Sequence, residues 1–255
     1  IPKEIKPDEY RVGLTPESVL TLVNGGHQVM VLTNAGLGIG KGDQDYLKVG
    51  AEIVATRDEI FERAEMVIKV KEPQLDECAL LRQGQILFTY LHLAPDPEQT
   101  NALVNSGVSA IAYESVVAED KSYPLLTPMS AIAGRMAVQA GASCLEKAKG
   151  GSGILMGGVT NVDPAKVTII GGGVVGYNAI EIALGMQANV TVLDKSAARL
   201  DYLETVFGDD LNAVLADSAS NETFIAAADL VIGAVLVPGA SAPKVGSRSL
   251  LKKMK

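Results

Sequence analysis

The chain has 255 residues, of which 47% are hydrophobic and 20% charged, and this length and composition predict a globular protein of two domains. Its formal net charge of −8 at pH 7 argues against a nucleic-acid-binding protein, because displacing phosphate counterions requires an excess of Lys and Arg. The most apolar stretch, Leu230–Pro238, is shorter than the roughly 20 residues that a membrane-spanning helix needs, so we expect no membrane partner.

Helical and extended segments alternate through the first half of the chain. We expect helices at 16–24, 43–49, 58–64, 75–82 and 97–106, and strands at 27–33, 52–55, 66–71, 85–91 and 108–113. Such alternation is typical of parallel strands joined by helical crossovers. The near-continuous apolar runs at 66–68 and 86–88 indicate strands that are buried on both faces.

A domain boundary is expected near Glu119–Pro128, where charged residues and two prolines interrupt the alternation. We place one domain at residues 1–125 and a second at 126–255. The second opens with a long helix rich in Ala and Gly at 130–147, for which Ser130 is the expected N-cap. Its expected strands follow at 167–170, 190–194, 211–215 and 230–235, with a last helix at 247–255.

This order predicts an α/β fold with two Rossmann-like doubly wound parallel-sheet domains and a cleft between them. A complete dinucleotide-binding sheet has about six strands. The second domain ends after a helix, where the next strand is due, so we expect it to be incomplete at its C-terminal end and the chain to be truncated there.

A glycine motif between a strand and a helix is the strongest indication of function. The apolar strand at 166–170 runs directly into Gly171, Gly173 and Gly176, which have GxGxxG spacing. Gly171 permits a tight turn, Gly173 lets the backbone approach a pyrophosphate, and Gly176 allows the helix to pack closely on the strand. The free amides of the helix then face the phosphates. The alternative is a glycine turn that only tightens a strand–helix corner.

Asp194 ends the next strand, at the spacing from the glycine motif that the ribose-binding acid has. Its carboxylate would bind the ribose hydroxyls and repel a 2′-phosphate, so the predicted cofactor is NAD rather than NADP. A solvated strand-end carboxylate is the other interpretation, and Lys195 and Arg199 are nearby cations that could accommodate a 2′-phosphate. Val235 and Leu236 lie at the end of the last expected strand, where backbone commonly lines the nicotinamide side of the cofactor.

Polar residues at strand ends indicate a substrate site in the first domain. His92 follows the strand at 85–91, where open α/β sheets bind ligands, and an ordinary imidazole pKa of about 6.5 suits proton transfer. A structural histidine is the alternative. Lys69 and Lys71 share a face of the neighbouring strand, which an anionic substrate would explain, as would a surface edge or an ion pair with Glu72.

Arg11 is a third candidate, in the opening loop of the chain. A planar guanidinium can hold a carboxylate through two hydrogen bonds, which a lysine cannot do. Position alone favours a solvated surface residue.

The two cysteines, Cys78 and Cys144, lie in expected helices and have no CxxC spacing. We expect buried or half-buried reduced thiols, which fit a reducing compartment such as the cytoplasm. No secretory signal opens the chain, and no metal site is predicted.

Together these segments resemble the alanine dehydrogenase family over nearly the whole chain. The matching stretches are Pro2–Lys6, Glu9–Pro16, Val70–Pro73, Gly84–Pro95, Pro128–Ser130, Ala133–Arg135, the glycine motif and Asp229–Gly239. The resemblance implies NAD-dependent interconversion of L-alanine with pyruvate and ammonia, by a homo-oligomer that is commonly a hexamer.

The resemblance also implies roles for individual residues. Arg11 would hold the substrate carboxylate, Lys71 would contact the carboxylate or carbonyl oxygen, and His92 would be the acid–base residue. Met129 would contact the cofactor. The expected cofactor-binding residues are Ser130, Gly171, Gly173, Val174, Val175, Gly176, Asp194, Arg199, Val235 and Leu236. In the family a further strand with a catalytic aspartate follows, which this chain lacks.

Two other functions remain open. The soluble NAD(H)-binding domain of proton-translocating transhydrogenase would pass hydride to a second nucleotide domain and needs no amino-acid pocket. The joint presence of Arg11, Lys71 and His92 speaks against it. The third possibility is a non-catalytic NAD-binding module, in which NAD occupancy regulates association with a partner.

Overall fold

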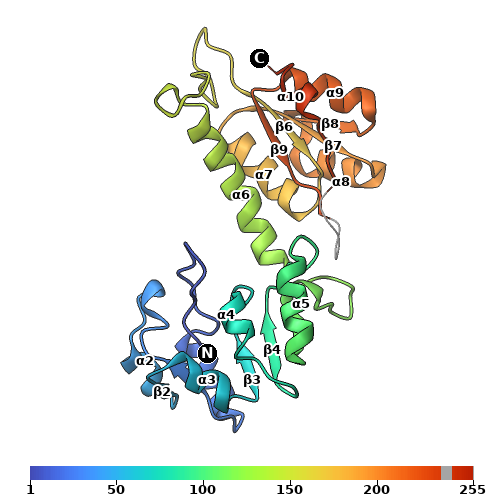
Figure 1. Cartoon of the computed structure of the whole chain (residues 1–255). Coiled ribbons are helices and arrows are strands. Elements are labelled where there is room, and N and C mark those ends of the chain that lie inside the picture. The colour runs from blue at the N-terminus through green and yellow to red at the C-terminus, as the bar shows by residue number, and fades with distance from the viewer. Residues whose placement is uncertain (237–242, 255) are drawn as a thin grey trace. The chain divides into compact units, whose positions relative to one another are not determined.

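The computed structural model describes residues 1–236 and 243–254, which form two compact units (Figure 1). Unit 1 holds residues 1–123, and unit 2 holds residues 124–236 and 243–254. Each unit has hydrophobic cores of its own and parallel strands of its own. The predicted α/β class with parallel sheets is thereby confirmed.

Unit 1 alternates helices and strands, several of them shorter than expected. Its helices are α1 (Pro16–Asn24), α2 (Asp43–Leu47), α3 (Arg57–Arg63), α4 (Leu75–Cys78) and α5 (Pro97–Ser106), with 3₁₀ turns η1 (Leu37–Ile39) and η2 (Tyr113–Ser115). Its strands are β1 (Met30–Leu32), β2 (Glu52–Val54), β3 (Met66–Ile68), β4 (Ile86–Thr89) and β5 (Ser109–Ala112). β1 pairs with β2, and β3, β4 and β5 form a second parallel sheet in that order. The carboxyl ends of β3 and β4 therefore lie side by side.

The ends of α5 follow from local capping chemistry. The Asp96 side chain accepts a hydrogen bond from the Gln99 N–H at 3.0 Å, and Pro97 occupies the first turn. Gly107 ends the helix with φ 71°, a left-handed conformation that glycine adopts without strain. These signals lie within a few residues of the helix, which is why the sequence alone predicts both of its ends.

Two expected elements of unit 1 stop early. The helix expected at 75–82 ends at Cys78, because the next N–H groups close tight turns, Leu80 to the Glu77 carbonyl and Leu81 to the Cys78 carbonyl. The strand expected at 66–71 ends at Ile68. Both lysines that follow it therefore lie in the segment after the strand rather than on a strand face.

Unit 2 is built on one four-stranded parallel sheet. Its helices are α6 (Thr127–Cys144), α7 (Val174–Gly185), α8 (Ala197–Phe207), α9 (Ser218–Ala227) and α10 (Arg248–Leu251), with 3₁₀ turns η3 (Lys147–Lys149) and η4 (Gly208–Asp210). Its strands are β6 (Lys166–Ile170), β7 (Asn189–Asp194), β8 (Leu211–Leu215) and β9 (Leu230–Gly233). The strand order is β8-β7-β6-β9, so the order reverses between β6 and β9. Ligands of open α/β sheets bind at the carboxyl ends of the strands at such a switch point.

The long helix α6 begins earlier than expected, at Thr127, with Pro128 in its first turn. The Ser130 N–H donates to the Leu126 carbonyl at 3.0 Å, so Ser130 lies inside the helix and the prediction that it is the N-cap is wrong. α6 packs on α7 with the two backbones in close approach (Figure 1). A Cβ at Gly134 would lie 2.1 Å from the carbonyl oxygen of Val175.

The C-terminal elements are shorter than expected. β9 ends at Gly233, and α10, capped by the Ser247 side chain, covers only part of the helix expected at 247–255. The last part of the family-like stretch, at 237–239, lies outside the described residues, as does Lys255. Among the residues that the structure describes, no helix is both long and apolar enough to cross a bilayer.

The two cysteines differ in exposure. Cys78 is buried, whereas Cys144 at the end of α6 is exposed, so the expectation of burial or half-burial is wrong for Cys144. Neither forms a disulfide in the structure.

Candidate active site

The glycine motif forms the turn between β6 and α7 at the switch point of unit 2. Gly171 has φ 101°, which side chains rarely adopt, and a Cβ there would lie 2.8 Å from the carbonyl oxygen of Ala234. A Cβ at Gly176 would lie 1.8 Å from the carbonyl oxygen of Gly171. Both positions therefore require glycine for steric reasons, one for the turn and one for the approach of helix to strand.

Gly173 differs from Gly171 and Gly176 because the space that a side chain would enter is open. A Cβ there would meet no atom within 4 Å, and Gly173 caps α7 without a side chain. The first helical bond of α7 runs from the Tyr177 N–H to the Gly173 carbonyl at 2.9 Å. The N–H groups of Val174 and Val175 precede that bond and have no partner within the helix. A helix start of this kind offers hydrogen-bond donors and a positive dipole end to an anion.

Asp194 lies at the carboxyl end of β7 and holds the glycine turn. Its Oδ2 accepts the Gly172 N–H at 2.7 Å, and its Oδ1 accepts the Ser196 N–H at 2.9 Å. Each carboxylate oxygen has two lone pairs, so Asp194 keeps the capacity to accept hydrogen bonds from a ligand hydroxyl.

Arg199 packs against the same turn. Its Nε donates to the Gly172 carbonyl at 2.6 Å, and its guanidinium carbon lies 4.7 Å from the ring centroid of Tyr202. Asp194 and Arg199 thus both bind Gly172: the carboxylate accepts its N–H, and the guanidinium donates to its carbonyl.

Val235 and Ser130 also lie in unit 2. A Cβ at Gly171 would come within 3.1 Å of Val235 Cγ2, so Val235 lies directly against the turn. Leu236 beside it is 57% exposed. Ser130 lies one turn of α6 before Gly134, the residue in contact with Val175 at the start of α7.

In unit 1, Arg11 is paired with a carboxylate that the sequence did not single out. Glu9 accepts hydrogen bonds from Arg11 at 2.8 Å (Nε), 2.6 Å (Nη2) and 2.9 Å (backbone N–H). The Arg11 guanidinium lowers the pKa of Glu9, and its hydrogen bond with Glu9 raises its own pKa. An arginine held in this way is oriented, whereas the sequence alone favoured a solvated one.

His92 lies just past the end of β4 in a left-handed conformation, with φ 50°. The Glu114 carboxylate accepts the N–H groups of Leu91 and His92, at 3.1 and 2.8 Å to Oε1. The same oxygen lies 3.8 Å from His92 Nδ1, and the imidazole is half exposed. The His92 ring stacks on Tyr90, with ring centroids 6.1 Å apart and planes 6° from parallel. Glu114 therefore holds the His92 backbone, and the Tyr90 ring contacts one face of the imidazole.

Lys71 and Lys69, which the sequence treated as a pair, have different surroundings. The Lys71 Nζ is partly exposed and lies 3.7 Å from Glu72 Oε2, which is the ion pair that the sequence left open. Lys69 is completely buried between Glu4 and Glu77. An anionic substrate therefore does not explain Lys69, because its ammonium is already paired and enclosed.

Electrostatic effects show that the residues predicted to bind substrate share one neighbourhood. Both Arg11 and Lys71 lower the pKa of Glu9. Burial raises the pKa of Tyr90, while the charge of Arg11 opposes that shift and the charge of Glu114 adds to it. Arg11, Lys71 and the Tyr90–His92 pair thus lie within one field at the carboxyl ends of β3 and β4.

Three further residues belong to this neighbourhood, and the sequence alone does not single them out: Glu9, Tyr90 and Glu114. Glu114 follows β5, the third strand of the sheet, so its position after a strand end was an available signal. Tyr90 lies two residues before His92 in the sequence, which was likewise an available signal. Nothing local in the sequence pairs Glu9 with Arg11 rather than with solvent.

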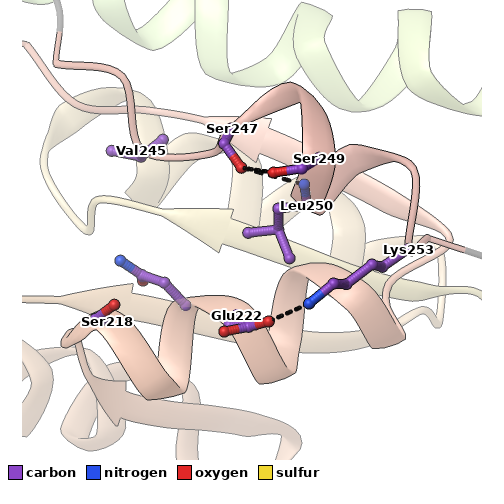
Figure 2. Close-up of a pocket in the computed structure, with 8 residues that line it drawn as sticks. Ser218, Glu222, Val245, Ser247, Ser249, Leu250 and Lys253 are labelled. Carbon is purple, nitrogen blue, oxygen red and sulfur yellow. Dashed lines mark hydrogen bonds and ion pairs between the residues drawn. The ribbon is translucent and has the colours of Figure 1, made fainter.

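Figure 2 shows a separate cavity of about 330 Å³ between α9 and the C-terminal segment, where Glu222 and Lys253 form an ion pair at 2.5 Å. None of the predicted site residues lines it. In the described part of the chain, no group of three or more His, Cys, Asp or Glu side chains could hold a metal ion.

Two family descriptions match the chain. Residues 1–133 match "Alanine dehydrogenase/PNT, N-terminal domain", and residues 137–255 match "Alanine dehydrogenase/PNT, C-terminal domain". The two matches together span nearly all of the chain.

Individual proteins agree with the family matches. The alanine dehydrogenase of Methanococcus maripaludis is 52% identical over 254 residues, covering 100% of this chain and 68% of that protein. A solved structure described as L-alanine dehydrogenase is 52% identical with a TM-score of 0.89, covering 100% of this chain and 70% of that one. A transhydrogenase from Sinorhizobium meliloti is 28% identical with a TM-score of 0.82, covering 100% and 74%.

Proposed function

The chain belongs to the alanine dehydrogenase/PNT family, and on that premise we propose that it catalyses the NAD-dependent oxidative deamination of L-alanine. In this reaction L-alanine, NAD⁺ and water give pyruvate, ammonium, NADH and a proton, and the reverse reaction aminates pyruvate. The observation that carries the proposal is that one chain holds both the glycine motif between β6 and α7 and the three residues Arg11, Lys71 and His92. The first serves a dinucleotide and the second serves a small amino or oxo acid.

The residues of unit 2 fit NAD. Gly173 leaves open space beside the unpaired amides of α7, which suits the close approach of a pyrophosphate. Asp194 keeps lone pairs for the ribose hydroxyls, and its negative charge disfavours a 2′-phosphate. Arg199, Val235, Leu236 and Ser130 complete the proposed cofactor-binding set. When bound, NAD accepts the hydride that leaves the substrate carbon.

The residues of unit 1 fit a small substrate with a carboxylate. Arg11 is already oriented by a carboxylate, Glu9, and a planar guanidinium held in this way suits the carboxylate of alanine or pyruvate. We propose that Lys71 binds the carboxylate or carbonyl oxygen through its ammonium. His92 is oriented to take a proton from water or the substrate amine and to return it in the reverse direction.

The test is the oxidation of NADH by pyruvate and ammonium with the 255-residue chain, followed by absorbance. Turnover should be lost in His92→Asn, because asparagine tolerates the left-handed backbone at this position but cannot exchange a proton near neutral pH. His27→Asn is the matched control, since His27 is exposed and remote in sequence from every proposed role. A version of the chain extended to the length of its relatives that binds NADH yet shows no response to pyruvate and ammonium would argue against an amino-acid dehydrogenase.

The second candidate is the NAD(H)-binding part of a transhydrogenase, favoured by the 28% identical transhydrogenase that covers this whole chain. Such a protein needs the nucleotide-binding glycine motif, but it binds no amino acid for which Arg11 and Lys71 would be required. Saturation of the NADH complex with pyruvate separates the two: an altered NADH fluorescence titration supports the dehydrogenase, and an unaltered one supports the transhydrogenase component.

Assembly and compartment belong to the same proposal. We infer a homo-oligomer, by family resemblance a hexamer, which light scattering coupled to size-exclusion chromatography tests directly. The cysteines Cys78 and Cys144, both free, support a reducing compartment and hence the cytoplasm.

A further inference from the structure

Lys69 is a fully buried lysine two residues before Lys71. Its Nζ lies 2.9 Å from Glu77 Oε1 and 3.2 Å from Glu4 Oε2, and none of the three side chains is more than 1% exposed. Burial raises the pKa of Glu4, and the Lys69 charge opposes that shift. Burying ions costs so much solvation that a cluster of this kind adds little to stability. Its presence therefore calls for an explanation other than folding.

The remaining oxygens of the two carboxylates hold backbone. Glu4 Oε1 accepts the Val70 N–H at 2.6 Å, and Glu77 Oε2 accepts the Gln74 N–H at 2.9 Å. Val70 and Gln74 stand on either side of residues 71–73. One buried ammonium thus fixes two carboxylates, and each carboxylate fixes one end of the segment that carries Lys71.

The other side of this segment borders open space. Glu72, Pro73 and Gln74 contribute to a cavity of about 200 Å³, to which Lys6 and Asp96 also contribute. Within the segment Lys6 pairs with Glu72, and the Cys78 thiol donates to the Pro73 carbonyl, while Glu4 and Glu77 hold the two ends at Val70 and Gln74.

We propose that Glu4, Lys69 and Glu77 are positioning residues, which hold the Lys71 ammonium at the point where the substrate oxygen binds. The inference rests on the role proposed above for Lys71. The Lys69 ammonium itself reaches no substrate, because both of its partners enclose it. Its effect passes through the carboxylates to the backbone, and small displacements of a binding group cost a large part of its effect.

The test measures the reactivity of Lys71 without requiring turnover. The full chain is acylated with trace acetic anhydride between about pH 6 and pH 10, which brackets lysine titration. Peptide mass spectrometry then gives the acylation rate of Lys71 relative to Lys48, an exposed lysine of the same unit. The measurement is repeated with NADH and pyruvate, which should protect Lys71.

The variants are Glu77→Gln and Glu4→Gln, which keep the size of the side chain and remove its charge. Glu52→Gln is the matched control, since Glu52 is an exposed carboxylate of the same unit that pairs with Arg63. Amide hydrogen exchange at Val70 and Gln74 shows whether the anchors have loosened, and protection elsewhere in unit 1 shows that the variant is folded.

We expect Lys71 acylation relative to Lys48 to rise about threefold in Glu77→Gln, because local opening exposes the ammonium. The pH dependence of Lys71 acylation should change. The pyruvate concentration that halves the rate of Lys71 acylation should rise about tenfold. Glu4→Gln should act in the same direction, and Glu52→Gln should change nothing. If Glu77→Gln does not fold, the Glu4→Gln variant decides.

Two negative results have different meanings. If pyruvate fails to protect Lys71 in the unsubstituted chain, the role proposed for Lys71 is wrong, and the positioning role loses its purpose with it. If pyruvate protects Lys71, but the rate, pH profile and protection are the same in both folded glutamine variants, the cluster is only structural and the positioning role is overturned.

Discussion

Alanine substitutions at three glycines of α7 and its cap separate the steric role of the motif from its binding role. At Gly176 a Cβ would lie 1.8 Å from the Gly171 carbonyl oxygen, at Gly173 it would meet no atom within 4 Å, and at Gly185 it would also meet none. The same chemical change therefore enters a backbone contact at Gly176, open space at the helix start at Gly173 and open space at the helix end at Gly185.

The magnitudes follow from these distances. Gly176→Ala forces the turn and the helix apart by about 1.2 Å to reach the 3.0 Å that real Cβ contacts keep. Overpacking of this kind costs about 1–3 kcal/mol of unfolding free energy. Gly173→Ala should change stability by no more than about 1 kcal/mol, the scale of a helix cap. Gly185→Ala should be neutral or stabilising by up to about 1 kcal/mol, because alanine favours a helix more than glycine does.

NADH binding should follow a different order. Gly173→Ala places a methyl group at the proposed pyrophosphate site, so the NADH dissociation constant should rise at least about tenfold, as expected when a reacting or binding group is displaced. Gly176→Ala should lose both affinity and stability, and Gly185→Ala should lose neither. Urea denaturation gives the stability and NADH fluorescence gives the affinity. A Gly173→Ala chain that binds NADH normally would refute the placement of the pyrophosphate at this helix start.

Three further predictions address charge and thiol chemistry. Asp194→Asn should weaken NADH binding about tenfold, because one acceptor for the ribose hydroxyls is removed. It should also reduce the difference in affinity between NADH and NADPH, because the charge that repels a 2′-phosphate is removed, and calorimetry measures both affinities. Arg11→Ala should raise the lowered pKa of Glu9. The stability that this pair contributes is present above the ordinary glutamate pKa of 4.5 and is lost as pH falls through the lower folded value, so urea midpoints of the two chains should converge in acid. Burial raises the pKa of Cys78 to about 11, so at pH 8 a disulfide reagent should titrate Cys144 rapidly and Cys78 slowly, and Cys144→Ser should remove the fast phase.

The parts of the fold that the sequence predicts well are those with local causes. α5 begins and ends at the predicted residues because Asp96, Pro97 and Gly107 act on their immediate neighbours. The turn between β6 and α7 is equally local, since the glycine spacing itself encodes the close approach of Gly176 to Gly171. The same is true of the alternation that predicts parallel strands.

The parts that the sequence misses depend on partners far along the chain. Glu4 reaches Val70 across 66 residues, and Glu114 reaches His92 across 22. No periodicity or spacing rule connects such pairs, so the sequence leaves an anionic substrate as one explanation of Lys69, whereas the structure shows it as an internal counter-ion of Glu4 and Glu77. The sequence predicts too late a start for α6 for the opposite reason: the local cap preference of serine points to Ser130, whereas the helix begins at Thr127 with Pro128 in its first turn.

The strand ends that carry the proposed site share one structural feature, a carboxylate that accepts hydrogen bonds from backbone N–H groups. Asp194 holds Gly172, Glu114 holds Leu91 and His92, and in each case a carboxylate accepts backbone N–H groups of the loop that presents the functional residue. At His92 the energetic consequence can be followed. A left-handed residue other than glycine costs about 1–3 kcal/mol, and hydrogen bonds to a charged acceptor contribute about 1.5–3 kcal/mol each. The two hydrogen bonds that Glu114 accepts are therefore of the size needed to offset the strain of the left-handed backbone at His92, the proposed acid–base residue. Because that ordering cost is met during folding, less of it is left to be met during binding.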